Sequence, residues 1–93
     1  MKAQMFNFQK WIEETDPKKL KAIFESLLLE SGFNIEGFID KKFTPHGWTA
    51  LWLLSESHFA IHTFPEHGKS YIELSSCIDK PYNDFIDNYN KAF

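Results

Sequence analysis

Several residue types are scarce in this chain, and each absence narrows the possible functions. The sequence contains no arginine, and lysine supplies all 10 of its lysine and arginine side chains. The formal net charge is -3, and no cluster of basic residues stands out. Nucleic acid is therefore not an expected partner. Without arginine, the chain also lacks the planar, bidentate clamp for carboxylates that a guanidinium provides.

Cysteine and long apolar runs are scarce as well. Cys77 is the only cysteine, so no disulfide can form within the chain. We find no signal-peptide pattern and no apolar run of membrane-spanning length, which favours a cytoplasmic protein without a membrane contact. A length of 93 residues fits one domain, residues 1–93, with a modest core.

The spacing of apolar residues predicts two helices. Asp16 before Pro17 is typical of a helix start, and Gly32 is typical of a helix end. A second amphipathic helix is expected to follow Pro81. The residues predicted to face the core are Leu20, Ile23, Phe24, Leu27 and Leu28 in the first helix, and Phe85, Ile86, Tyr89 and Phe93 in the second.

Strands are predicted for most of the remaining chain. Residues 5–13 are expected to form an edge strand, and four further strands are expected at 33–43, 47–55, 57–65 and 69–77. The fold class is therefore α+β: a two-layer sandwich in which an antiparallel sheet carries helices on one face.

The last two strands carry more reactive side chains than a sheet needs to fold. With Glu66 to Gly68 as a short loop, Pro65 would lie opposite Lys69, and Ser57 would lie opposite Cys77. Directly opposed residues share a face, with Cβ atoms about 5 Å apart. The hairpin therefore predicts that the thiol and this serine are neighbours.

Strand alternation places His62 away from this pair. Ser57 and His62 are five positions apart, so their side chains point to opposite faces of the sheet. His62 is therefore not expected to reach the Ser57 of its own strand.

The motif Ser55-Glu56-Ser57-His58, followed by Ile61-His62-Thr63-Phe64-Pro65-Glu66 and then Cys77, resembles a known family. It is similar to the short bacterial and archaeal form of S-adenosylmethionine decarboxylase, a pyruvoyl enzyme of polyamine (spermidine) synthesis. The family usually has tryptophan at the position of Phe64. A weaker similarity covers residues 43–49, where Thr49 takes the place of a serine.

The resemblance implies a proenzyme that cleaves itself between Glu56 and Ser57. Ser57 would become a covalent pyruvoyl group, the only cofactor expected, which forms a Schiff base with the substrate amine. His62 and Thr49 would assist this processing, and Cys77 would donate a proton after carbon dioxide leaves.

The resemblance also implies a homodimer with shared active sites. One protomer would supply the pyruvoyl group and Cys77, and the other would supply His62 and Thr49. An aromatic residue that stacks on adenine and a glutamate that binds ribose would be Phe43 and Glu66. A His62 that faces away from its own Ser57 agrees with service to a partner's Ser57.

Simpler interpretations remain open at this point. A lone cysteine such as Cys77 is usually a small buried apolar residue. Glu66 can be an ordinary loop residue, and Phe43 can serve in packing. No metal site is expected, because His58 and His62 would stand roughly 13 Å apart on one strand and cannot converge on one ion.

Two other functions also remain open. One is a pyruvoyl decarboxylase of another amino acid, such as ornithine or arginine. The other is an unprocessed, non-catalytic homologue that acts as a partner or regulator of an active enzyme.

Overall fold

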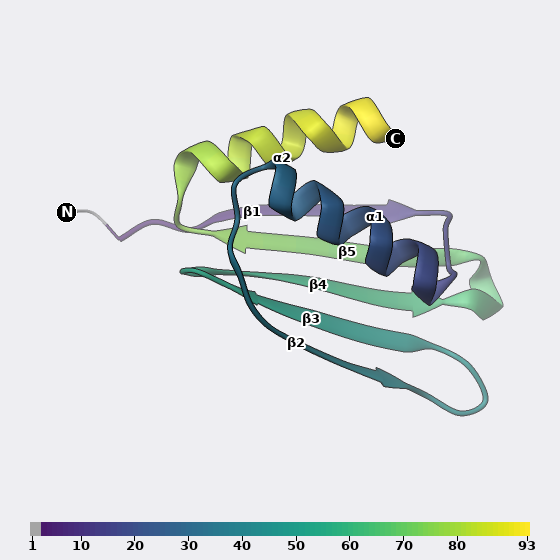
Figure 1. Cartoon of the computed structure of the whole chain (residues 1–93). Coiled ribbons are helices and arrows are strands. Elements are labelled where there is room, and N and C mark those ends of the chain that lie inside the picture. The colour runs from purple at the N-terminus through teal and green to yellow at the C-terminus, as the bar shows by residue number, and fades with distance from the viewer. Residues whose placement is uncertain (1–2) are drawn as a thin grey trace.

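The computed structural model describes residues 3–93 and consists of one antiparallel sheet with two α-helices (Figure 1). The sheet has five strands in the order β1-β5-β4-β3-β2. The α+β sandwich predicted from the sequence is confirmed. In chain order the elements are β1 (Phe6–Ile12), α1 (Pro17–Glu30), β2 (Ile35–Lys42), β3 (Trp48–Leu54), β4 (Ser57–Phe64), the 3-10 turn η1 (Pro65–His67), β5 (Lys69–Ser76) and α2 (Asp79–Ala92).

Helix α1 begins and ends where its sequence signals predict. The Asp16 carboxylate accepts a hydrogen bond of 3.0 Å from the backbone N–H of Lys19, and Pro17 occupies the first turn. Gly32, just beyond the last turn, has a φ of 96°, a conformation that glycine adopts without a steric penalty. The residues buried on its inner face are Leu20, Phe24, Leu27 and Leu28.

Helix α2 begins earlier than predicted. It starts at Asp79, so Pro81 lies inside its first turn rather than before it. A proline is tolerated there because the first backbone N–H groups of a helix have no partner within it. Phe85 and Tyr89 are buried as expected, whereas Phe93 is 50% exposed at the chain's end.

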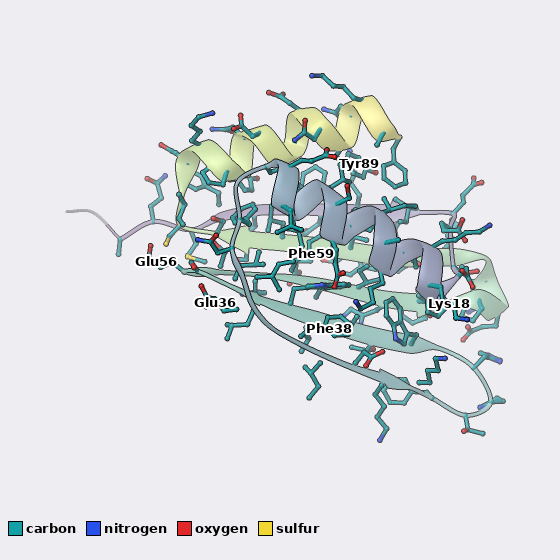
Figure 2. All side chains as sticks on the ribbon, viewed as in Figure 1. Lys18, Glu36, Phe38, Glu56, Phe59 and Tyr89 are labelled. Atoms are coloured by element: carbon teal, nitrogen blue, oxygen red, sulfur yellow. The ribbon has the colours of Figure 1, made fainter. Side chains whose placement is uncertain are left out.

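Both helices cover the same face of the sheet (Figures 1 and 2). Phe59 of β4 lies at the centre of this contact. Its ring centroid is 5.0 Å from that of Phe24 in α1 and 5.6 Å from that of Phe85 in α2. Stacking of this kind adds to the free energy of apolar burial and fixes where the two helices sit.

One buried polar group in this layer is satisfied across the interface. Trp52 is fully buried, and its Nε1–H donates to Glu25 Oε2 at 3.0 Å. Burial alone would raise the pKa of Glu25, but hydrogen bonds from Lys21 and Trp52, together with the lysine charge, outweigh it and lower that pKa. The carboxylate therefore stays ionised and keeps its bond to the indole.

The opposite face of the sheet carries no helix among residues 3–93 (Figure 1). Five large apolar side chains on it are exposed: Trp11, Ile39, Leu51, Leu53 and Phe64. We call this surface the open face. Neither helix of the described chain is long and apolar enough to cross a membrane.

Candidate functional site

The register of the β4–β5 hairpin differs by one residue from the prediction. Phe64 pairs with Lys69, and Ser57 pairs with Ser76 rather than with Cys77. The cause is Pro65, which has no N–H for the ladder and instead begins the turn η1. The connection is therefore one residue longer than expected, and Gly68 closes it with a φ of 66°.

The opposite end of β4 holds the peptide bond predicted to be cleaved. Ser55 and Glu56 form the whole connection between β3 and β4, because Leu54 pairs directly with Ser57. Glu56 has a φ of 56°, in the left-handed region. That conformation costs a residue with a side chain roughly 1–2 kcal/mol. The backbone is therefore strained at the residue that supplies the carbonyl of this bond.

Cys77 approaches the same peptide bond from the end of β5. Its thiol Sγ lies 3.3 Å from the Glu56 carbonyl oxygen, with the thiol as donor. The cysteine is exposed and lies just past the last paired residue of the strand. The predicted cross-strand pair of Cys77 with Ser57 is therefore wrong, and the thiol instead contacts the carbonyl of Glu56, the residue before Ser57.

The Ser57 hydroxyl has a partner that the sequence reasoning missed. Ser57 is 7% exposed, and its Oγ–H donates to Ser76 Oγ at 2.7 Å. Ser76 is fully buried. The available signal was position alone: Ser76 directly precedes Cys77, and a loop longer by one residue would have placed it opposite Ser57.

A second group of polar side chains lies at the far end of the sheet. Thr49 and His62 are paired residues of β3 and β4 on the open face. Thr49 Oγ1 and His62 Nδ1 are 3.0 Å apart and share a hydrogen bond. Both side chains are half-buried, so they stay in contact with solvent.

Phe43 and Glu66 join this second group. Together with Thr49 and His62 they line a hollow of about 320 Å³. The backbone N–H of Phe43 donates to the Gly47 carbonyl at 2.8 Å, which closes the loop between β2 and β3. The ring of Phe43 is 47% exposed and can therefore stack against a flat partner.

Two neighbours orient the polar groups around this hollow. His46 Nε2 lies 3.5 Å from Glu66 Oε2, a contact that the sequence did not predict. The ring of Tyr71 stacks beside that of His62, with centroids 6.3 Å apart. Burial, then the hydrogen bond and the charge of Glu73, raise the pKa of Tyr71, so its hydroxyl stays protonated and neutral.

The predicted site residues thus form two separate groups. Glu56, Ser57 and Cys77 lie at one end of the sheet, which the label of Glu56 marks in Figure 2. The hollow with His62 lies at the other end. Ser57 and His62 are five residues apart on one strand, about 16 Å along it, and face opposite sides. Within one chain the two groups do not meet.

Nearly the whole chain matches a known family. The family model of S-adenosylmethionine decarboxylase covers residues 5–93. The chain belongs to the S-adenosylmethionine decarboxylase family.

Individual proteins show the same similarity. The chain is 40% identical over 65 residues to a protein of Syntrophomonas wolfei named S-adenosylmethionine decarboxylase proenzyme, a match that covers 70% of this chain and 52% of that protein. A protein of Halalkalibacterium halodurans named S-adenosylmethionine decarboxylase proenzyme 2 is 33% identical over 70 residues, which cover 75% of this chain and 55% of that protein. The chain therefore spans about half the length of these curated relatives.

A solved structure has the same fold. The crystal structure of the adenosylmethionine decarboxylase from Aquifex aeolicus superposes with a TM-score of 0.74 at 23% sequence identity. The superposition covers 94% of this chain and 78% of that one.

Proposed function

We propose that this chain is the proenzyme of a pyruvoyl-dependent decarboxylase that acts on S-adenosylmethionine and supplies polyamine synthesis. The observation that carries the proposal is the 3.3 Å contact between the Cys77 thiol and the carbonyl of Glu56, the strained residue that precedes Ser57. The word proenzyme in the names of two relatives supports it, since it implies a chain that must be processed.

The first processing step is an acyl shift. Ser57 Oγ attacks the Glu56 carbonyl carbon, so that a C–O bond forms, the C–N bond breaks, and the hydroxyl proton passes to the released amine. Negative charge develops on the Glu56 oxygen during the attack. The Cys77 thiol already points at that oxygen and stabilises the charge as a hydrogen-bond donor. Breaking the bond also releases the backbone strain at Glu56.

The second step is an elimination from the ester. The Cα proton of residue 57 is removed and the Cβ–O bond breaks, which frees residues 1–56 with a new carboxylate on Glu56. Water then displaces ammonia from the remaining dehydroalanine residue and leaves a pyruvoyl group. The base for the elimination is His62, oriented by its 3.0 Å hydrogen bond with Thr49. Since His62 cannot reach its own Ser57, it serves the partner's chain.

The residues at the processed site fit the chemistry of such a cofactor. A pyruvoyl group at position 57 would supply an electron-accepting carbonyl for the decarboxylation of a bound amine. Cys77 lies beside this position and is exposed, so its thiol can return a proton where carbon dioxide leaves. Ser76 and the burial of position 57 keep bulk water from this side.

The hollow at the other end of the sheet would hold the nucleoside. Phe43 offers an exposed ring for stacking on adenine, and the Glu66 carboxylate can accept hydrogen bonds from ribose hydroxyls. The amino acids arginine and ornithine contain neither adenine nor ribose. Carbon dioxide release from S-adenosylmethionine, but not from those two amino acids, is the expected result for the processed protein.

A homodimer brings the two groups together. In a two-fold dimer each contact occurs twice, so the Ser57 end of one protomer can face the hollow of its partner. The open face supplies an apolar surface for this association, with Ile39 69% and Leu53 59% exposed.

Intact-protein mass spectrometry under denaturing conditions tests the proposed processing. We expect two fragments, residues 1–56 and residues 57–93, the second beginning with pyruvoyl. That fragment should resist Edman degradation and gain the mass of a reduced amine adduct when borohydride and an amine are added. A folded protein that keeps the mass of the full chain after long incubation would instead favour the non-catalytic homologue.

Substitution of the cysteine should affect both stages. Cys77→Ala removes the donor to the Glu56 carbonyl, so we expect cleavage about tenfold slower and decarboxylation about a hundredfold slower or more. Cys77→Ser keeps a donor and should cleave faster than the alanine variant. Fragment masses over time and released carbon dioxide measure the two rates. Unchanged decarboxylation by Cys77→Ala would remove the thiol from the mechanism.

A further inference from the structure

The Ser57 hydroxyl is held by a buried hydroxyl that is itself hydrogen-bonded to the backbone. Ser76 lies directly opposite Ser57 in the register of β4 and β5. Its Oγ accepts a hydrogen bond of 3.0 Å from the backbone N–H of Ile78 and donates to the Ile78 carbonyl at 3.4 Å. Ser76 is fully buried, so water does not compete for these bonds.

A count of donors and acceptors fixes the direction of the Ser57–Ser76 bond. A serine hydroxyl has one donor and two acceptor positions. The Ser76 hydroxyl donates to the Ile78 carbonyl and accepts from the Ile78 N–H. The position that remains for Ser57 is therefore an acceptor. The Ser57 proton therefore points at Ser76, and both lone pairs of Ser57 Oγ remain free.

We propose that Ser76 is a positioning residue for self-cleavage: it orients the Ser57 hydroxyl so that a free lone pair faces the Glu56 carbonyl carbon. This inference rests on the proposed function. In the acyl shift the Ser57 Oγ–C bond forms as the C–N bond breaks, and the proton moves from Oγ to the amine. Ser76 neither gains nor loses a proton; it acts before the attack by fixing one rotamer at a position 7% exposed.

The neighbouring serine provides a matched control. Ser75 is equally buried, at 7% exposure, and its Oγ donates to Asn7 Oδ1 at 2.7 Å. Strand alternation places it on the opposite face, where it pairs with His58 and does not contact Ser57. Ser75→Ala thus removes a comparable hydrogen bond from the same strand without touching the nucleophile.

The experiment compares cleavage rates of four full-length proteins by denaturing mass spectrometry: wild type, Ser76→Ala, Ser76→Thr and Ser75→Ala. We expect Ser76→Ala to cleave about ten- to a hundredfold more slowly. Ser76→Thr keeps the hydroxyl and should recover most of the rate, and Ser75→Ala should cleave like wild type. If Ser76→Ala does not fold, Ser76→Cys replaces it in the comparison. Cysteine has a similar shape but accepts hydrogen bonds weakly, so this variant should also cleave more slowly than wild type.

Hydroxylamine separates this role from a role in the elimination. It attacks the ester and so cuts the chain without an elimination step. If Ser76 acts on the attack by Ser57, little ester forms, and hydroxylamine should not restore cleavage of Ser76→Ala. Restoration by hydroxylamine, a wild-type rate for Ser76→Ala, or equal slowing in Ser76→Ala and Ser76→Thr would each overturn the proposal. A folded wild type that never cleaves would overturn the proposed function, and this inference with it.

Discussion

Ser57→Ala is expected to remain one chain of full mass, with no fragment after any incubation. The substitution removes the hydroxyl that must attack the Glu56 carbonyl, and the alanine methyl group that replaces it cannot form the ester. The fold should survive, because Ser76 keeps its bond to the Ile78 N–H. Loss of the Ser57–Ser76 hydrogen bond should lower the free energy of unfolding by about 1 kcal/mol.

Ser55→Ala is the control for this experiment. Ser55 lies in the same two-residue connection, but its Oγ donates to Glu36 Oε2 at 2.7 Å. We expect it to cleave at nearly the wild-type rate. Mass spectrometry over time, with thermal unfolding to verify folding, compares the two variants. Cleavage of Ser57→Ala at the same bond would show that the reaction is not the proposed acyl shift.

Local signals in the sequence predicted the elements but not every boundary. The ends of α1 could be predicted directly, because they depend on local backbone effects of Asp16, Pro17 and Gly32. Pro81 misled the prediction of α2, because a proline is compatible with a position inside the first turn as well as with one before it.

The hairpin register depended on one residue. Treating Pro65 as part of β4 made the loop too short and paired Ser57 with Cys77. In the structure Pro65 starts η1, and every pair of the hairpin moves by one. This shift explains why Ser76 was missed and why the contact of Cys77 is with a carbonyl instead of a side chain.

The hollow could not be derived from strand alternation alone. Alternation correctly places His62 on the face opposite to Ser57. Phe43 and Glu66, however, come from the β2–β3 loop and from η1, and only the folded arrangement brings them to Thr49 and His62. Their link to His62 was predicted from the family resemblance alone, and their roles remain predictions.

Mixing two inactive variants should restore processing if the sites are shared. His62→Ala lacks the base and Ser57→Ala lacks the nucleophile, so each alone should stay uncleaved. In a heterodimer, the Ser57→Ala chain lends its intact His62 and Thr49 to the intact Ser57 of the other chain. We therefore expect fragments from the His62→Ala chains only. The cleaved fraction of these chains should not exceed the fraction of them that is present in heterodimers. Mass spectrometry identifies these fragments because residues 57–93 then carry alanine in place of His62 and have a correspondingly lower mass.

A second mixture tests whether Thr49 and His62 act together within one hollow. Thr49 and His62 share a 3.0 Å hydrogen bond, so both belong to the hollow. A heterodimer of Thr49→Ala with His62→Ala has one defect in each hollow and no intact site. No chain in this mixture should therefore be cleaved faster than the slow rate that Thr49→Ala alone can retain. Restored cleavage here, failure of the first mixture in verified heterodimers, or a protein that stays monomeric at working concentration would contradict shared sites. Since Ser57 and His62 lie about 16 Å apart on one strand and on opposite faces, cleavage by a monomer would require a base that the proposed mechanism does not contain.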